Sequence, residues 1–164
     1  MLAPLTQFIC DTCGQVIERP EDGWVEWISD FEGERPMNRG FRITHHHSTS
    51  PIATEHNEGC YKYTNHSGRS DLHLHDFISE EYKMAEILSY LDIGPYHDPT
   101  YHGPYVNNMR EYVEFVRRLT IPYYEEARQY WQDAIDDGYF GDCNELWLYG
   151  ASNLKRLIEQ YSEE

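Results

Sequence analysis

Residues 8–14 read Phe-Ile-Cys-Asp-Thr-Cys-Gly and form the strongest local pattern in the chain. Cys10 and Cys13 make a Cys-x-x-Cys pair, and Gly14 follows directly. Two thiolates at this spacing can hold one metal ion, and a glycine after them lets the backbone turn back beneath the ion. The stretch therefore predicts a metal-binding turn near the start of the chain. A redox pair of the thioredoxin kind is less favoured, because it should begin a helix in a βαβ unit and no such pattern surrounds this one.

The composition is that of a folded chain of modest size. Its 164 residues suit one domain, or one domain with a small appended module. Hydrophobic residues make up 40%, which is low for a globular domain, and aromatic residues make up 15%, with 14 tyrosines. Tyrosine buries a large ring while its hydroxyl stays polar, so it can compensate for a small aliphatic core. We therefore expect a folded protein rather than a disordered one.

The charge balance argues against two classes of partner. Lys and Arg number 13 against 29 Asp and Glu, for a formal net charge of −16. Nucleic acids and anionic membrane surfaces both require a basic surface, so we expect no nucleic-acid partner and no membrane partner. Solubility is the simplest reason for such acidity. The alternatives are an acidic face that meets a basic protein partner or one that mimics nucleic acid.

Nothing in the sequence resembles a targeting or membrane segment. Residues 1–7 lack the basic region and long apolar run of a secretory signal, and no window approaches the roughly 20 apolar residues of a membrane span. We therefore expect a soluble, cytoplasmic protein. The four cysteines are then expected to bind metal or to remain free thiols rather than to form disulfides.

The hydrophobic pattern changes character near residue 65. Strands are expected at residues 5–9, 23–28, 41–45 and 60–64, with a loop at 29–39 and a linker at 65–70. Helices are expected at residues 76–91, 108–119, 122–135 and 152–161, with an irregular segment at 139–150. Asn107 or Asn108 should cap the second of these helices, and Ser152 the last.

These elements predict an α+β protein in two parts. The first, residues 1–65, is a small β-rich module held together by zinc. The second, residues 71–164, is mainly helical and should pack against the first as one compact unit. A core this small gains stability from a metal, because the free energy of metal binding becomes folding free energy.

The metal ligands can be completed from the strand pattern. A structural zinc site needs four ligands in a tetrahedron, often three cysteines and one histidine. Cys60 can supply the third sulfur and one residue of the run His45-His46-His47 the fourth ligand. Alternation along the strand puts Phe41, Ile43 and His45 on one face and His46 on the other. We therefore predict the set Cys10, Cys13, His45 and Cys60, with His46 as the alternative to His45.

The first third of the chain resembles the zinc ribbons. Residues 8–14 match the first knuckle of a ribbon, but the second half lacks another Cys-x-x-Cys. The chain also looks like small bacterial proteins without an assigned function that open with Cys-Asp-x-Cys-Gly and later carry an Arg-Ile-x-His-His strand, which residues 42–46 match. The resemblance implies a zinc-ribbon-like module and no particular activity.

Asp71, His73 and His75 form a second pattern, Asp-x-His-x-His. It resembles the metal-binding opening of polymerase-and-histidinol-phosphatase phosphoesterases and the His-x-His of amidohydrolases. Those enzymes are (β/α)8 barrels of about 250 residues, for which too little chain follows this motif. The simpler interpretation is the start of a helix, with Leu72 and Leu74 packed inward.

The expected function is therefore a non-enzymatic, metal-stabilised, cytoplasmic module that binds another protein through a fold held by a structural zinc. The alternative is a metal-dependent hydrolase that uses the histidine-rich segments. The two differ in metal content: a second metal at His73 and His75, with a position open for water, would be expected only of the hydrolase.

Overall fold

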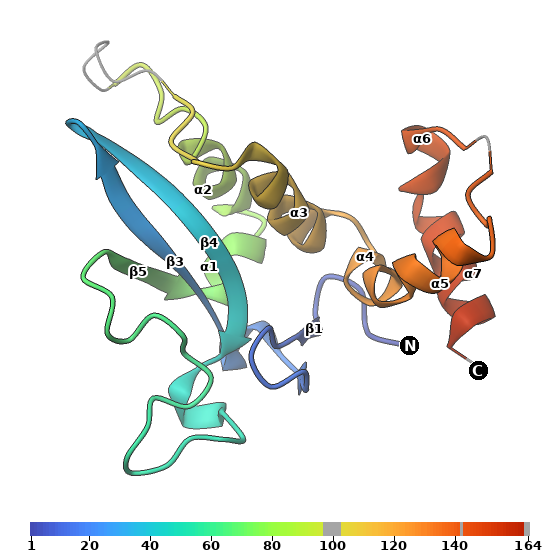
Figure 1. Cartoon of the computed structure of the whole chain (residues 1–164), viewed down its shortest axis with the longest axis horizontal. Coiled ribbons are helices and arrows are strands. Elements are labelled where there is room, and N and C mark those ends of the chain that lie inside the picture. Colours follow the sequence, from blue (N-terminus) through green and yellow to red (C-terminus); the bar gives the residue numbers. More distant parts are fainter. Residues whose placement is uncertain (97–102, 142, 163–164) are drawn as a thin grey trace.

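The computed structural model describes residues 1–96, 103–141 and 143–162 (Figure 1). The strands are β1 (Phe8–Ile9), β2 (Val16–Ile17), β3 (Gly23–Glu32), β4 (Arg35–His45) and β5 (Arg69–His73). The α-helices are α1 (Leu74–Ile78), α2 (Lys83–Ser89), α3 (Met109–Thr120), α4 (Tyr124–Ala127), α5 (Trp131–Asp136), α6 (Glu145–Leu148) and α7 (Ala151–Tyr161). Short 3-10 helices are η1 (Pro20–Asp22), η2 (His47–Thr49) and η3 (Arg128–Tyr130). Strands occupy the first part of the chain and the α-helices the second, which confirms the predicted α+β class.

A long antiparallel hairpin of β3 and β4 dominates the sheet (Figure 1). The prediction of a loop at residues 29–39 is wrong, because the strands continue to the pair Glu32–Arg35 and turn at Gly33, whose φ is +67°. Pro36 is tolerated inside β4 because β4 is an edge strand of the order β4-β3-β5. The hairpin also bends at a bulge near Gly40, where φ is +71° and an added Cβ would lie 2.5 Å from the hydroxyl of Tyr63.

The third strand of this sheet, β5, begins in the last residues of the expected linker and continues into the part expected to be helical. It pairs antiparallel with β3, from Trp24 opposite His73 to Ile28 opposite Arg69. The predicted strand at residues 60–64 is a loop instead, so this prediction is wrong. Strand β5 lies at the edge of the sheet and has no fully buried residue, so its sequence is polar and lacks the hydrophobic alternation that indicates a strand. The sheet thus uses residues on both sides of the predicted domain boundary.

The first hydrophobic core lies between the sheet and helices α1, α2 and α3. Its centre is a group of stacked and edge-on aromatic rings: Phe41 stacks on Trp27 with centroids 5.7 Å apart and on Phe115 at 4.9 Å. The single helix predicted at residues 76–91 is broken at Ser79, which has extended backbone angles. The break lets Phe77 of α1 and Ile87 of α2 both reach this core.

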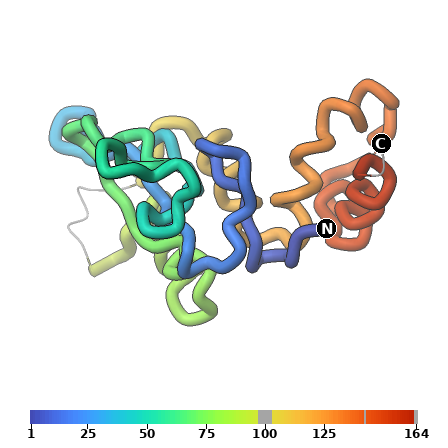
Figure 2. The backbone as a smooth tube through the Cα atoms, turned by 90° about the horizontal axis from the view of Figure 1, so that it is seen from below, coloured from blue at the N-terminus to red at the C-terminus, as the bar shows by residue number. Residues whose placement is uncertain are grey.

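Helices α4 to α7 surround a second, smaller core. Its fully or nearly buried members are Tyr124, Ala127, Ala134, Leu154, Leu157, Ile158 and Tyr161. In Figures 1 and 2 these helices, coloured orange to red, lie to one side of the sheet, and the N-terminus lies beside them. The first residues are held there by Glu126, which lies 3.9 Å from the terminal amine and accepts a hydrogen bond from the amide of Leu2. The two hydrophobic cores therefore divide near residue 120.

The helix ends agree with the sequence in part. The side chain of Asn108 accepts hydrogen bonds from the amides of Arg110 and Glu111, so the predicted cap of α3 is confirmed. Gly150, not Ser152, precedes α7, and a short helix, α6, lies in the segment expected to be irregular. Within the residues described, no helix has the length and apolar character needed to cross a bilayer.

Candidate metal centre

The structure brings Cys10, Cys13, His45 and Cys60 together. One potential ligand atom of each residue lies within 4.8 Å of every other. Nδ1 of His45 is 3.5 Å from Sγ of Cys13 and 3.8 Å from Sγ of Cys60. With metal–sulfur bonds of about 2.3 Å and a metal–nitrogen bond of about 2.0 Å, a tetrahedral zinc site would have sulfur–nitrogen edges near ~3.5 Å. The cluster therefore has the dimensions of a four-ligand zinc site.

Three members of this cluster are almost inaccessible to solvent. Cys10 is 1% exposed, Cys60 0% and His45 6%, while Cys13 is partly exposed. The pKa of the Cys60 thiol is raised from 9.0 to about 12, chiefly by burial, against a lowering by the hydrogen bond with Ser50 and with a smaller raising contribution from Cys10. Three thiols this close together cannot all ionise without a compensating cation, and thiolates are the form that binds metal. The chemistry of the site is therefore suited to a divalent ion.

The second nitrogen of His45 is oriented by the backbone. Its Nε2 lies 3.3 Å from the carbonyl oxygen of Val16, on β2. A proton on Nε2 donates to this oxygen and leaves the lone pair of Nδ1 free to face the sulfurs, as is usual for metal-binding histidines. His46 lies elsewhere: its Nδ1 is 2.7 Å from Oγ of Ser48, and its ring packs edge-on against Trp24. The geometry thus selects His45 over His46.

The Cys-x-x-Cys turn is closed by its own backbone. The amide of Gly14 donates to the carbonyl of Cys10 at 3.0 Å, and the amide of Cys10 donates to the carbonyl of Gln15 at 2.9 Å. Gly14 has a φ of +72°, a conformation that favours glycine. The short strands β1 and β2 pair on either side of this turn. Hydrogen bonds among residues 10–15 therefore close the turn that carries both sulfurs.

Cys60 has no regular element to hold it, and a buried carboxylate does so instead. Glu26, in the middle of β3 and 0% exposed, accepts hydrogen bonds from the amides of Lys62 at 2.8 Å and Tyr63 at 3.2 Å. The guanidinium of Arg42 lies 3.6 Å from the same carboxylate and offsets its charge. Because Lys62 and Tyr63 closely follow Cys60, Glu26 fixes the loop that carries the third sulfur.

Asp11, between the two cysteines of the turn, joins the turn to other elements. Its carboxylate accepts from the amide of Ile43 on β4 at 2.8 Å and from the guanidinium of Arg118 on α3 at 2.8 Å. Arg128 lies 3.4 Å from its second oxygen. The metal-binding turn is therefore tied both to the strand that ends in His45 and to the helical part of the chain.

Arg118 and Glu125 form the buried centre of this connection. Each is 5% exposed, and Nε of Arg118 donates to Glu125 at 2.7 Å. Burial alone would lower the pKa of Arg118, but Glu125 and Asp11 together raise that pKa above its ordinary value. Arg118 also donates to the carbonyl of Ile9 at 3.1 Å, and the amide of Ile9 donates to Glu125 at 2.9 Å. The backbone of Ile9 in β1 thus makes one hydrogen bond to each member of this ion pair.

Sequence reasoning missed these supporting charges: Asp11, Glu26, Arg118 and Glu125. A partial signal exists for two of them. Glu26 interrupts the apolar strand pattern of residues 24–28, and Arg118 directly precedes Leu119 in the buried stripe of α3. A charged residue on the apolar face of an element indicates a buried partner, although the sequence does not say which.

The motif Asp71-x-His73-x-His75 does not form a second metal cluster. The ring of His73 packs on Trp24 with centroids 4.3 Å apart, and His75 lies 3.5 Å from the carboxylate of Glu21. Among the described residues, the Cys3His group is the only set of three or more ligand side chains close enough to hold an ion. No protein-family model, curated protein or solved structure matches the chain.

Proposed function

We propose that Cys10, Cys13, His45 and Cys60 hold a structural zinc ion in a non-enzymatic, cytoplasmic protein-interaction module of zinc-ribbon-like character. The observation that carries the proposal is the closed cluster of four ligand atoms, all within 4.8 Å of one another. Catalytic zinc sites commonly use three protein ligands and keep a fourth position for water or substrate. Four protein ligands leave no such position.

The ligand chemistry supports zinc over other ions. Three thiolates and one imidazole suit zinc, whereas magnesium and calcium prefer oxygen ligands. All four cysteines of the chain are free rather than paired. Free thiols persist in a reducing compartment, which supports a cytoplasmic location.

The proposed role of the ion is to join three segments that are distant in sequence. These are the turn at Cys10 and Cys13, the end of β4 at His45, and the loop at Cys60. Short strands and long loops bury little apolar surface, so binding of an ion adds directly to folding free energy. Because Asp11 lies within the same turn, the ion also supports the contact with Arg118.

An exposed apolar surface on α2 supports the interaction role. Met84 and Leu88 are four residues apart on this helix and are 55% and 50% exposed. The acidic side chains of Glu80 and Glu81 precede the helix and are also exposed. Exposed apolar groups rimmed by charge are typical of protein-binding surfaces, and this one suits a partner with apolar and basic side chains.

The zinc site is tested by elemental analysis of protein purified without chelator. We expect about one zinc per chain, lost in Cys60→Ser and retained in the matched variant Cys143→Ser, because Cys143 is exposed and outside the cluster. The double variant His73→Ala/His75→Ala should keep the same ratio. Absence of metal from the wild type would overturn the zinc site, and a second ion lost in the double variant would favour the hydrolase.

The interaction role requires a separate test. We expect a partner that co-purifies with the wild-type chain to be lost from Met84→Ser/Leu88→Ser, while the zinc content and the circular dichroism spectrum stay unchanged. A matched control is Ile135→Ser, since Ile135 is 57% exposed on α5. Equal recovery of the partner by both variants would contradict an interaction through α2.

A further inference from the structure

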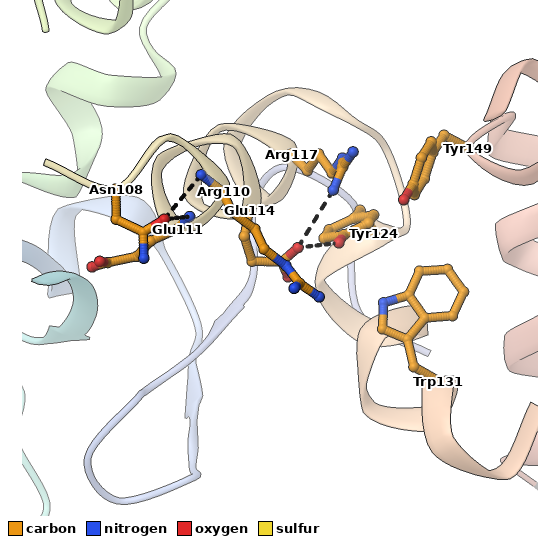
Figure 3. A pocket seen from close by; sticks show the side chains of 8 residues that line it. All are labelled: Asn108, Arg110, Glu111, Glu114, Arg117, Tyr124, Trp131 and Tyr149. Carbon is orange, nitrogen blue, oxygen red and sulfur yellow. Dashed lines mark hydrogen bonds and ion pairs between the residues drawn. The ribbon is translucent and has the colours of Figure 1, made fainter. Parts of the chain in front are cut away.

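A pocket of about 490 Å³ lies between α3 and the C-terminal helices (Figure 3). One wall is the solvent-facing side of α3, with Arg110, Glu111, Glu114 and Arg117, and the other is aromatic. The volume is in the range of small-molecule sites, which is roughly 300–1,000 Å³. None of the Cys3His residues lines the pocket, so a ligand could bind here whether or not zinc occupies the Cys3His cluster.

The aromatic wall consists of Tyr124, Trp131 and Tyr149. The ring of Tyr124 is 5.9 Å from each of the other two, and Trp131 is 6.5 Å from Tyr149, between ring centroids. The three rings, from α4, α5 and the residue that follows α6, pack tilted or edge-on to one another, and with Tyr124 only 1% exposed the aromatic surface of the pocket comes from Trp131 and Tyr149. Such a surface favours a flat ligand that can lie against or edge-on to the rings.

Two of the four charges on the facing wall are already engaged. Glu114 accepts a hydrogen bond from the hydroxyl of Tyr124 and lies 3.9 Å from Arg117. The guanidinium of Arg117 in turn sits over the ring of Tyr149, 4.4 Å from its centroid. In Figure 3, dashed lines join the carboxylate of Glu114 to both Tyr124 and Arg117. These side chains shape the pocket, and their charges largely cancel.

Arg110 is the cation left for a ligand. It is exposed, lines the pocket, and forms no ion pair with any described residue. In Figure 3 its side chain reaches from the first turn of α3 toward the side of the pocket where Trp131 lies. The positive end of the α3 dipole adds to its field. Glu111 is the opposing charge on the same wall. With two arginines and two glutamates in its lining, the pocket is close to neutral, although the chain as a whole carries a formal net charge of −16.

We propose that this pocket binds a small planar aromatic anion, either a carboxylate or a phosphate. The aromatic part would lie against Trp131, beside Tyr149, one face of which Arg117 covers. The anionic group would pair with the guanidinium of Arg110, which can donate two parallel hydrogen bonds to either group. An anion is preferred to a cation because Arg110 is exposed and has no ion pair among the described residues, whereas Glu114 is held by Tyr124 and Arg117 and Glu111 is only partly exposed.

Calorimetric titration of the full chain with four compounds tests the proposal. Naphthylacetate and naphthyl phosphate carry the ring with either anionic group, naphthylmethylamine carries the ring with a positive charge, and cyclohexylacetate carries the anion without an aromatic ring. We expect one or both aromatic anions to bind with a Kd below about 1 mM and the other two compounds to bind at least about tenfold more weakly. The comparison of the two aromatic anions distinguishes carboxylate from phosphate.

Paired variants connect the binding to the pocket. Arg110→Gln should weaken the aromatic anions about tenfold, whereas Glu111→Gln should strengthen them by removing the opposing charge. Arg156→Gln, at an exposed arginine on α7, is the matched control and should have no effect. Trp131→Leu should abolish binding and Trp147→Leu, outside the pocket, should not. Equal binding of the amine and the anions, no binding of either aromatic anion, or equal affinities of Arg110→Gln and Arg156→Gln would overturn the proposal.

Discussion

The two halves of this molecule are stabilised in different ways. The sheet with α1–α3 combines an aromatic core with a Cys3His cluster, the buried carboxylate of Glu26 and the partly buried carboxylate of Asp11. Helices α4–α7 pack around a core of apolar and tyrosine side chains, and no Cys/His cluster lies among their described residues. A helix satisfies its own backbone and needs only an apolar stripe, whereas irregular loops need side chains or ions to satisfy and position them. The difference explains why the candidate metal ligands all lie in the first half.

Removal of the metal should produce the largest effect and should reveal this asymmetry. For Cys10→Ser we expect zinc loss, a stability decrease of at least about 4 kcal/mol and a Tm lower by about 10 °C or more, since structural zinc contributes roughly 10–16 kcal/mol in small zinc-finger peptides. Hydrogen exchange followed by mass spectrometry should show faster exchange in β1–β5 than in α7. Cys143→Ser is the control. Uniform loss of protection across both halves would contradict the proposed division.

The pH dependence should have opposite signs with and without metal. Metal binding must displace thiol protons, so the apparent affinity should fall by up to about tenfold per displaced proton for each unit of pH decrease near neutrality. In metal-free protein the pKa of Cys60 is raised from 9.0 to about 12, so the folded state holds this proton more tightly than the unfolded state. The contribution of this thiol to the free energy of unfolding is then complete below pH 9 and is lost as the pH rises toward 12.

Both signs can be measured directly. Competition with a chromophoric chelator across neutral pH gives the metal affinity, and urea unfolding of the metal-free protein at alkaline pH gives its stability. Cys60→Ser supplies the control, because it removes the titrating thiol. A metal affinity that does not vary with pH would show that the thiols are not the ligands.

The next largest effect is expected for the Arg118–Glu125 ion pair, which joins the two halves. Arg118→Met leaves the buried Glu125 with only the longer contact to Arg128 at 3.4 Å, and loss of one member of a buried ion pair typically costs up to about 3–5 kcal/mol. We expect faster hydrogen exchange in β1 and α4, which this pair joins, and a lower zinc affinity because Asp11 also loses a partner. The double variant Arg118→Met/Glu125→Met should recover part of the stability. If Arg118→Met alone unfolds no more easily than Arg110→Met, the pair does not link the halves.

The sequence was informative where a signal is local. Alternation along residues 41–45 put His45, and not His46, on the face that meets the cysteines, and Asn108 was recognisable as a helix cap. An interaction between residues that are distant in the sequence leaves no such local signal. Arg118 is separated from Asp11 by 107 positions, so nothing near either residue indicates the other.

Three errors in the fold have the same physical origin. The strand β5 is polar because it lies at the edge of the sheet, the hairpin continues past Pro36 because β4 is also an edge, and the break at Ser79 is set by packing of Phe77 and Ile87 into one core. Propensity describes a residue alone, whereas the position of an element in the sheet or core decides the outcome. The hydrophobic pattern changes near residue 65, yet the strand β5 still follows that point, and the two hydrophobic cores divide only near residue 120.

The smallest effect is expected for a surface ion pair in the second half. Lys155 and Glu159 are one helical turn apart on α7, 3.7 Å between charged atoms, and about half exposed. Such pairs contribute only about 0.3–0.5 kcal/mol and are weakened by salt. Lys155→Ala should therefore leave the urea midpoint nearly unchanged, and any difference should vanish in high salt, while the effect of Arg118→Met should persist there because its partner Glu125 is buried. Comparable salt sensitivity of the two variants would mean that the Arg118–Glu125 pair is hydrated in solution, and the contrast between the halves would then rest on the metal cluster alone.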